Sequence, residues 1–177
     1  MPIANNNLPS IFLIGPMGAG KTTIGRQLAR QLKRDFYDSD RVIEERTGAD
    51  IPLIFELEGE DGFRKRETAI IDELTRLDNV VLATGGGAVL NAENRQHLAG
   101  RGTVVYLSSS LPALLERTRK DKNRPLLHAE EGPEAVLSRL LEQRDPLYRQ
   151  TADFVIDTSH NSIRNIIKAI IGHLEQD

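Results

Sequence analysis

The sequence Gly-Pro-Met-Gly-Ala-Gly-Lys-Thr occupies residues 15–22 and decides how this chain folds. It follows a short apolar run at residues 11–14 and precedes a stretch with helical periodicity. A glycine, four further residues and then Gly-Lys-Thr is the spacing of a phosphate-binding loop. Its glycines let backbone N–H groups turn toward phosphate oxygens, while Lys21 suits the β- and γ-phosphates and the Thr22 hydroxyl suits Mg²⁺. The stretch therefore predicts a nucleotide phosphate site between a buried strand and a helix.

Short apolar segments alternate with helical patterns along the rest of the chain. Such alternation is typical of an α/β fold with a parallel sheet between layers of helices. The last helical pattern is the clearest, because apolar residues recur from Ile163 to Leu174 at the spacing of one helix face. We expect a three-layer α/β/α fold whose five-stranded parallel sheet is built from residues 11–14, 36–38, 80–83, 103–107 and 154–157.

Capping residues and helix breakers set the expected helix boundaries. Asp50 and Asn91 are predicted to be helix N-caps, since both residue types favour that position. Residues 59–62 contain two glycines and are expected to separate a short helix from a longer one that ends near Leu77. Two further helices are predicted, one from Arg41 to Thr47 that stops at Gly48 and one from Pro133 to about Arg144.

The composition describes a surface-rich globular chain of 177 residues with a net charge of −3. We expect a frayed tail at residues 1–10 and one domain at 11–177. The slight negative charge, the lack of a long apolar run and the lack of a signal-like segment predict a cytoplasmic protein that binds neither nucleic acid nor membrane. No cysteine is present, which excludes disulfides and thiolate chemistry, and no exposed apolar stripe stands out, so we expect a monomer.

Two carboxylates follow the second predicted strand, at Asp38 and Asp40. In a parallel sheet, ligands gather beyond the carboxyl ends of the strands, so both acids are site candidates. Mg²⁺ needs an acidic partner beside a phosphate loop, and the third strand ends in Thr84 rather than an acid. Asp38 is therefore the candidate for holding the metal, through water. The alternative for Asp40 is a helix N-cap.

Other candidate residues are less specific when each is taken alone. Gly85, Gly86 and Gly87 follow the third strand, where bare backbone can approach a ligand closely, although three glycines can also form a simple turn. Arg64 lies three residues before Glu67, a spacing that also fits a surface ion pair. The cations of residues 119–132 and of residues 144–148 could likewise be solvated.

The order of these motifs along the chain resembles that of the shikimate kinase family. The resemblance covers nearly the whole domain, and the combination is more specific than the phosphate loop alone. The matching segments are residues 15–23, Asp-Ser-Asp at 38–40, Phe-Arg-x-x-Glu at 63–67, Gly-Gly-Gly-Ala-Val at 85–89, Arg-Pro-Leu-Leu at 124–127 and Arg-x-Pro-Leu-Tyr at 144–148.

The resemblance implies a P-loop kinase fold with a mobile lid at about residues 119–132, and transfer of the γ-phosphoryl group of Mg²⁺-bound ATP to the 3-hydroxyl of shikimate. It implies that Asp40 is the catalytic carboxylate, assisted by Lys21 and the lid residue Arg124. The residues implied for shikimate are Asp40, Arg64, Gly86, Gly87 and Arg144. Those implied for nucleotide are Gly18, Ala19, Gly20, Lys21, Thr22, Thr23, Arg117 (against adenine) and Arg124, with Thr22 and Asp38 at the metal.

Two alternatives remain at this point. One is another small-molecule kinase on the same scaffold, of which a gluconate-type kinase is nearest, because adenylate-kinase-like loops typically place Gly after the lysine where this chain has Thr22. The other is a nucleotide-dependent switch with no acceptor. A panel of acceptor hydroxyls distinguishes the first, and the response to an Asp40→Asn substitution distinguishes the second.

Overall fold

A computed structural model describes residues 8–119 and 130–176 of the chain. Five parallel strands form one sheet, as the sequence predicts, and the structure gives their order as β2-β3-β1-β4-β5. The strands are β1 (Ile11–Ile14), β2 (Asp35–Asp38), β3 (Val80–Ala83), β4 (Thr103–Ser108) and β5 (Phe154–Asp157). The helices are α1 (Lys21–Leu32), α2 (Ser39–Thr47), α3 (Ile51–Leu74), the short 3-10 helix η1 (Ala88–Leu90), α4 (Ala92–Arg101), α5 (Leu111–Thr118), α6 (Pro133–Thr151) and α7 (Ile163–Leu174).

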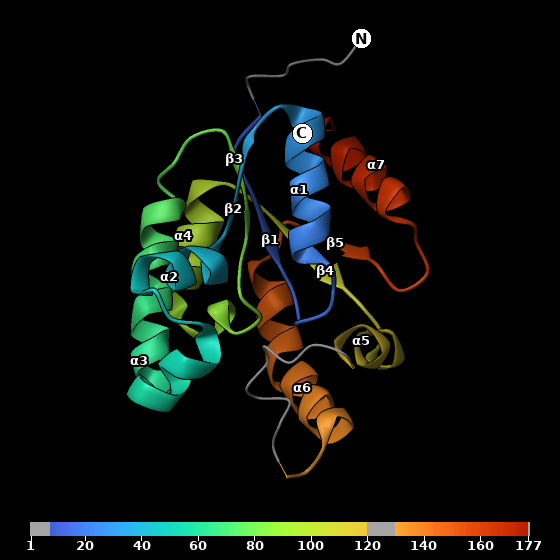
Figure 1. The fold of residues 1–177 in the computed structure, drawn as a ribbon. Helices are drawn as coiled ribbons and strands as arrows, with labels where there is room; N and C mark the ends of the chain where they lie inside the picture. The colour runs from blue at the N-terminus through green and yellow to red at the C-terminus, as the bar shows by residue number, and fades with distance from the viewer. Residues whose placement is uncertain (1–7, 120–129, 177) are drawn as a thin grey trace.

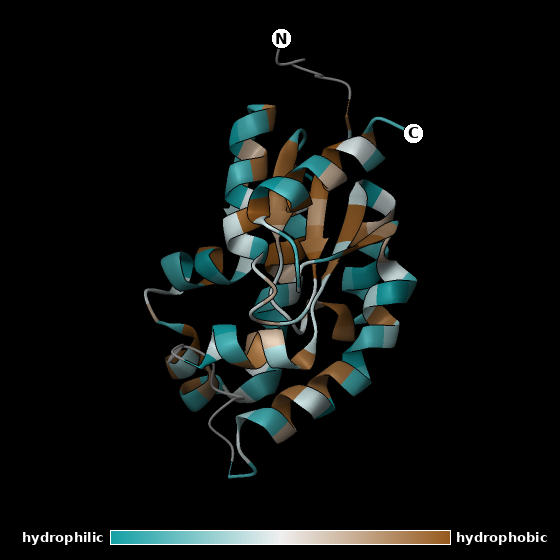
Figure 2. Ribbon diagram, turned by 90° about the vertical axis from the view of Figure 1, so that its right-hand side faces the viewer, coloured by the Kyte–Doolittle hydropathy of each residue, from teal (hydrophilic) through white to brown (hydrophobic). Residues whose placement is uncertain are grey.

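The central strand β1 is buried on both faces, and its alternating side chains enter two separate cores. Ile11 and Leu13 pack with α1 and α7, whereas Phe12 and Ile14 pack with α2, α3 and α4. Figure 1 shows these helices on opposite sides of the sheet, and Figure 2 shows apolar strands enclosed by helices whose outer surfaces are polar. The continuous apolar run of residues 11–14 therefore reflects a strand covered on both sides.

Helix α6 is longer than predicted. It does not end near Arg144 but continues through Pro146 to Thr151. A proline inside a helix removes one backbone hydrogen bond. The following turn persists because Tyr148 is fully buried in the core and its carbonyl accepts a bond from Ala152 N. As a result Arg144 and Tyr148 lie one turn apart on one helix face.

Three other boundaries differ from the predictions. The break expected at residues 59–62 is confined to Gly59 (φ 72°, ψ 178°), so that α3 resumes at once and ends at Leu74. Helix α2 begins at Ser39 rather than Arg41. Residues 8–10, predicted as part of a frayed tail, are held in place: Arg34 donates hydrogen bonds to the carbonyls of Leu8 and Pro9, at 2.6 Å each.

Local capping follows the sequence predictions. The Asp50 side chain accepts from Leu53 N at 3.0 Å at the start of α3, and the Asn91 side chain accepts from Glu93 N at 2.7 Å at the start of α4. These caps fix where α3 and α4 begin and hence how they lie over the sheet. The carboxyl ends of β1, β2 and β3 then meet at one edge of the molecule, where the candidate residues gather (Figure 1).

Candidate active site

The phosphate-binding loop connects β1 to α1, as the sequence predicts. Gly15 adopts φ 148°, a conformation that L side chains rarely adopt, and a Cβ there would overlap the Leu107 carbonyl of β4. The Lys21 ammonium is folded back onto the loop, donating to the carbonyls of Gly15 and Pro16 at 2.6 and 2.8 Å. The lysine charge is therefore held where the loop curls, beside the N-terminus of α1, a location that favours anions.

Thr22 and Asp38, the two residues predicted at the metal, are in direct contact. The Thr22 hydroxyl donates to Asp38 Oδ2 at 2.6 Å. Asp38 Oδ1 accepts from the backbone N–H of Asp40 and of Arg41, which makes Asp38 the N-cap of α2. The capping role considered for Asp40 thus belongs to Asp38. An adjacent hydroxyl and carboxylate oxygen fit Mg²⁺, a hard cation that takes oxygen ligands and keeps several waters.

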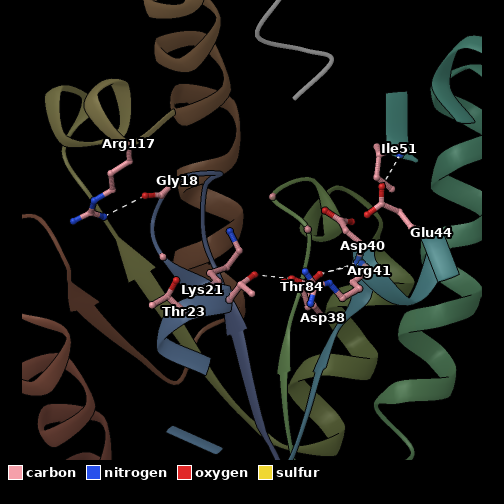
Figure 3. Close-up of a pocket in the computed structure, with 14 residues that line it drawn as sticks. Gly18, Lys21, Thr23, Asp38, Asp40, Arg41, Glu44, Ile51, Thr84 and Arg117 are labelled. Carbon is pink, nitrogen blue, oxygen red and sulfur yellow. Dashed lines mark hydrogen bonds between the residues drawn. The ribbon is translucent and has the colours of Figure 1, made fainter. Parts of the chain in front are cut away.

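A cavity of about 470 Å³ joins the phosphate-binding loop to the ends of β2 and β3. Figure 3 shows Gly18 and Arg117 on one side of this cavity and Asp40, Arg41 and Glu44 on the other. The described candidates that do not line this cavity are the buried Ala19 of the loop, Arg64, Gly87 and Arg144. The lining residues are Gly18, Gly20, Lys21, Thr22, Thr23, Asp38, Asp40, Arg41, Glu44, Ile51, Thr84, Gly85, Gly86 and Arg117.

The glycine turn after β3 is the place where the acceptor-side candidates converge. A Cβ on Gly85 would lie 2.7 Å from Asp40 Oδ1, and one on Gly87 would overlap the Arg64 guanidinium. A Cβ on Gly86 would lie 3.3 Å from Met17 N of the phosphate loop and 3.5 Å from Arg144 Nη1. None of the three glycines has a positive φ. They are therefore needed for space, so that two arginines, an aspartate and the phosphate loop can approach one backbone turn.

Arg64 and Glu67 do not form the surface ion pair considered from the sequence. Arg64 Nη1 donates to Glu67 Oε1 at 2.9 Å, and the Glu67 side chain is only 1% exposed. Burial raises the pKa of the Glu67 carboxyl, and the neighbouring Arg64 charge offsets this only in part. Glu67 Oε2 has no hydrogen-bond partner among the described residues, and a Cβ on Gly85 would lie 3.0 Å from it. Glu67 therefore orients Arg64 from behind the glycine turn.

Arg144 is 4% exposed and reaches the same turn from α6. Burial lowers the pKa of its guanidinium, and the nearby Arg64 charge lowers it further. The Nε atoms of both arginines are buried and have no hydrogen-bond partner within residues 8–119 and 130–176. One buried and one partly buried guanidinium group face the same turn, and together they fit a carboxylate ligand, since arginine can bind a carboxylate with two parallel hydrogen bonds.

Arg117, predicted against adenine, is fixed on the nucleotide side of the cavity. Its guanidinium donates to the carbonyls of Gly18 and Ala19 at 3.2 and 3.3 Å. It also donates to the hydroxyl and the carbonyl of Thr158, which follows β5. Arg117 thus connects the phosphate loop to the end of β5. Arg124 and most of the predicted lid lie outside the described residues.

Sequence reasoning missed several residues that shape the site. Glu67 was noted only as part of an ion pair, and its burial depends on tertiary packing. Ser39 is fully buried and its hydroxyl accepts from Gly85 N at 3.1 Å, which connects α2 to the glycine turn. Tyr148 donates its hydroxyl to Gly86 O at 2.6 Å. In the sequence, Tyr148 was noted only as part of the motif at residues 144–148.

Comparison with known proteins identifies relatives over nearly the whole chain. A family model described as shikimate kinase matches residues 17–175. A shikimate kinase of Methylococcus capsulatus is 57% identical over 96% of this chain and 94% of its own length. A shikimate kinase of Haemophilus influenzae is 56% identical over 94% of this chain and 92% of its own length.

Comparison with solved structures also identifies a shikimate kinase as a similar protein. A shikimate kinase from Acinetobacter baumannii in complex with shikimate superposes with a TM-score of 0.95 at 52% identity, covering 99% of this chain and 98% of the other. A gluconokinase from Sinorhizobium meliloti has a TM-score of 0.58 at 17% identity, covering 95% of this chain and 92% of the other. At that identity the gluconokinase shares the fold alone. No helix within the described part of the chain has both the length and the apolar character needed to cross a membrane.

Proposed function

This chain belongs to the shikimate kinase family, and from that premise we propose how its residues divide the transfer of a phosphoryl group. The reaction moves the γ-phosphoryl group of ATP to the 3-hydroxyl of shikimate. One observation carries the assignment of residues: Asp40 lines the same cavity as the phosphate loop, and the turn beside it is approached by the guanidinium groups of Arg64 and Arg144.

Asp40 is the proton acceptor in this proposal. The 3-hydroxyl oxygen attacks the γ-phosphorus, the bond to the β-phosphate oxygen breaks, and the hydroxyl proton passes to the Asp40 carboxylate. Asp40 is suited to this role because the Asp38 N-cap fixes the start of α2, on which Asp40 is the second residue. A positioned carboxylate that accepts a proton contributes about 10²–10⁴-fold to such a rate.

Arg64 and Arg144 are proposed to hold the carboxylate of shikimate. Their guanidinium groups are partly or fully buried, so a carboxylate ligand would meet little competition from water. The cyclohexene ring would then lie against Gly86 and Gly87, where side chains are absent. Fixing the acid at two arginines orients the ring hydroxyls and supplies the positioning on which phosphoryl transfer depends.

The nucleotide is proposed to bind along the phosphate loop. Lys21 already lies at the loop carbonyls and would move onto the β- and γ-phosphates, while Arg117 would pack against adenine. Arg124 is proposed to contact the phosphates from the lid, and this role stays a prediction because the residue lies outside the described ranges. The remaining contacts are assigned to Gly18, Ala19, Gly20, Thr22 and Thr23.

Mg²⁺ is proposed as the companion ion of ATP, beside Thr22 and, through water, Asp38. Their contact of 2.6 Å supports this assignment, because it presents two oxygen donors next to the phosphate loop. When bound, the ion neutralises charge on the transferring phosphates. The chain itself orients the Thr22 hydroxyl toward Asp38 and keeps Asp38 at the start of α2.

A phosphotransfer assay with the purified chain tests the proposal. Mg-ATP is supplied with shikimate, gluconate, a nucleoside monophosphate or no acceptor, and phosphorylated products are identified by mass spectrometry. We expect phosphate on shikimate alone, with ADP formed in equal amount. Phosphate on gluconate would support the alternative kinase, and ADP formed without any acceptor would support a nucleotide-dependent switch.

A further inference from the structure

The hydroxyl of Tyr148 lies at the junction of two parts of the acceptor site. Tyr148 is 1% exposed, and its hydroxyl donates to Gly86 O at 2.6 Å. Gly86 belongs to the turn that Asp40, Arg64 and Arg144 approach. Tyr148 also follows Arg144 by one helical turn on α6, so both side chains point from the same helix face toward the same turn.

Arg144 and Tyr148 approach the same glycine turn. The two side chains line one small cavity together with Pro16 and Met17 of the phosphate loop. A Cβ on Gly86 would lie 3.5 Å from Arg144 Nη1, so the arginine lies beside the residue whose carbonyl accepts the Tyr148 proton. The Tyr148 hydroxyl therefore holds the glycine turn at the point where Arg144 approaches it.

We propose that the Tyr148 hydroxyl is a positioning group for the acceptor site, holding the Gly86 turn and the Arg144 guanidinium in fixed relation before shikimate binds. This inference rests on the proposed function, in which Arg144 and Gly86 contact shikimate. Tyr148 itself does not line the cavity and acts through these two partners.

Loss of the hydroxyl has a specific physical consequence. Gly86 O would be left in a buried environment without its donor, and a buried carbonyl without a partner drives local rearrangement. The Arg144 guanidinium, which lies beside Gly86, would then face a turn that is no longer held in place. Shikimate would then have to order both groups on binding, which weakens its affinity. Tyr148 does not line the cavity that holds the proposed nucleotide residues, so the effect on ATP binding should be smaller.

Tyr106 provides a matched control within the same pair of rings. The rings of Tyr106 and Tyr148 are stacked with centroids 4.9 Å apart at 30°, and both side chains are 1% exposed. The Tyr106 hydroxyl donates to Asp145 Oδ1 at 2.6 Å and not to the glycine turn. Phenylalanine at either position keeps the ring and removes one buried hydroxyl, so the two variants differ only in which partner is lost.

The experiment compares steady-state kinetics and thermal melting of the full chain with those of Tyr148→Phe and Tyr106→Phe. We expect Tyr148→Phe to raise the KM for shikimate about tenfold, the typical effect of losing one buried hydrogen bond. The KM for ATP should change less than about twofold in both variants, and Tyr106→Phe should leave the KM for shikimate unchanged. In an Arg144→Ala background, Tyr148→Phe should have a smaller effect than in the wild type, because one of its partners is already gone.

Four outcomes would overturn the inference while leaving the kinase assignment intact. The KM for shikimate could stay unchanged in Tyr148→Phe, or it could rise equally in Tyr148→Phe and Tyr106→Phe. The KM for ATP could rise as much as the KM for shikimate, or Tyr148→Phe could raise the KM for shikimate by the same factor in the Arg144→Ala background as in the wild type. Failure of Tyr148→Phe alone to fold would also overturn it, because the hydroxyl would then serve the fold and not the site. A wild-type chain that does not phosphorylate shikimate would overturn the proposed function and this inference together.

Discussion

The two sides of the cavity are built in different ways. The phosphate-binding part of the nucleotide side is one continuous loop, in which Lys21 is held by carbonyls five and six residues before it, and Arg117 of α5 joins this loop from a distant part of the chain. The acceptor side is assembled from α2, α3, the turn after β3 and α6, and its hydrogen bonds join residues up to 62 positions apart, as between Tyr148 and Gly86. The phosphate-binding loop can be recognised from a short motif, whereas the acceptor side forms only when distant parts of the chain fold together.

This difference predicts where substitutions act. A change on the acceptor side should alter the handling of shikimate more than nucleotide binding, although the two sides meet where Thr22 contacts Asp38 and where Gly86 lies beside Met17. The substitutions of Asp40, Arg144 and Gly87 test that separation, each with a control of the same residue type elsewhere in the chain.

Asp40→Asn should have the largest effect. Asparagine keeps the size of the side chain but cannot accept the hydroxyl proton, so kcat should fall at least ~10²-fold while nucleotide affinity changes little. The control is Asp35→Asn, at an exposed position of β2. Kinetics and nucleotide titration measure the two quantities, and retained turnover in Asp40→Asn would remove Asp40 from its proposed role.

Arg144→Ala should raise the KM for shikimate about 10²-fold, since one of the two charges that hold the carboxylate is lost. The KM for ATP should stay within about threefold of the wild-type value, because Arg144 does not line the cavity formed by the phosphate loop and Arg117. Arg139→Ala, an exposed arginine on the same helix, is the control and should change neither. A larger effect on ATP than on shikimate would place Arg144 at the nucleotide.

Gly87→Ala should raise the KM for shikimate about tenfold, by displacing a guanidinium that makes charge-assisted hydrogen bonds. The added methyl group would overlap the end of Arg64, a flexible side chain that can move, so thermal stability should change little. Gly100→Ala is the control, because a Cβ there meets no atom of the described residues within 4 Å. Equal KM values in the two variants would show that Arg64 need not approach the turn.

Glu67→Gln should give the smallest effect, a pH-dependent shift in melting temperature. Burial raises the pKa of Glu67 above its usual 4.5, so its contribution to the free energy of unfolding is full below pH 4.5 and is lost as pH rises through the raised value. Glutamine does not titrate. The wild type should therefore lose stability relative to the variant between pH 4.5 and the raised pKa, as thermal melts across that range would measure. A relative gain by the wild type would mean that the Arg64 ion pair outweighs burial.

The sequence predicted the fold and the nucleotide side from local patterns. The strand of residues 11–14 and the loop after it were identified correctly because apolar runs, glycine spacing and Gly-Lys-Thr are contiguous signals. The extension of α6 past Pro146 was missed, because the buried Tyr148 side chain stabilises that turn through tertiary contacts. The burial of Glu67 was missed for the same kind of reason, since its i, i+3 spacing from Arg64 is equally typical of a surface pair.

The candidate site could be predicted in its members but not in its connections. The family resemblance named Asp40, Arg64 and Arg144, yet no pattern in the sequence predicted that three consecutive glycines would each face a different one of them. The sequence also did not predict that the Asp38 side chain would both cap helix α2 and accept a hydrogen bond from Thr22. Such shared roles depend on how α2 and the phosphate loop meet at the sheet edge.

The central claim is that the phosphate loop and Asp40 face one acceptor across a common cavity. A crystal structure of the chain with Mg-ADP and shikimate tests this most directly. We predict that the 3-hydroxyl of shikimate lies at about 2.6–3.2 Å from an Asp40 carboxylate oxygen, with the shikimate carboxylate on Arg64 and Arg144. A shikimate molecule bound with that hydroxyl directed away from Asp40, or with its carboxylate on other residues, would contradict the account.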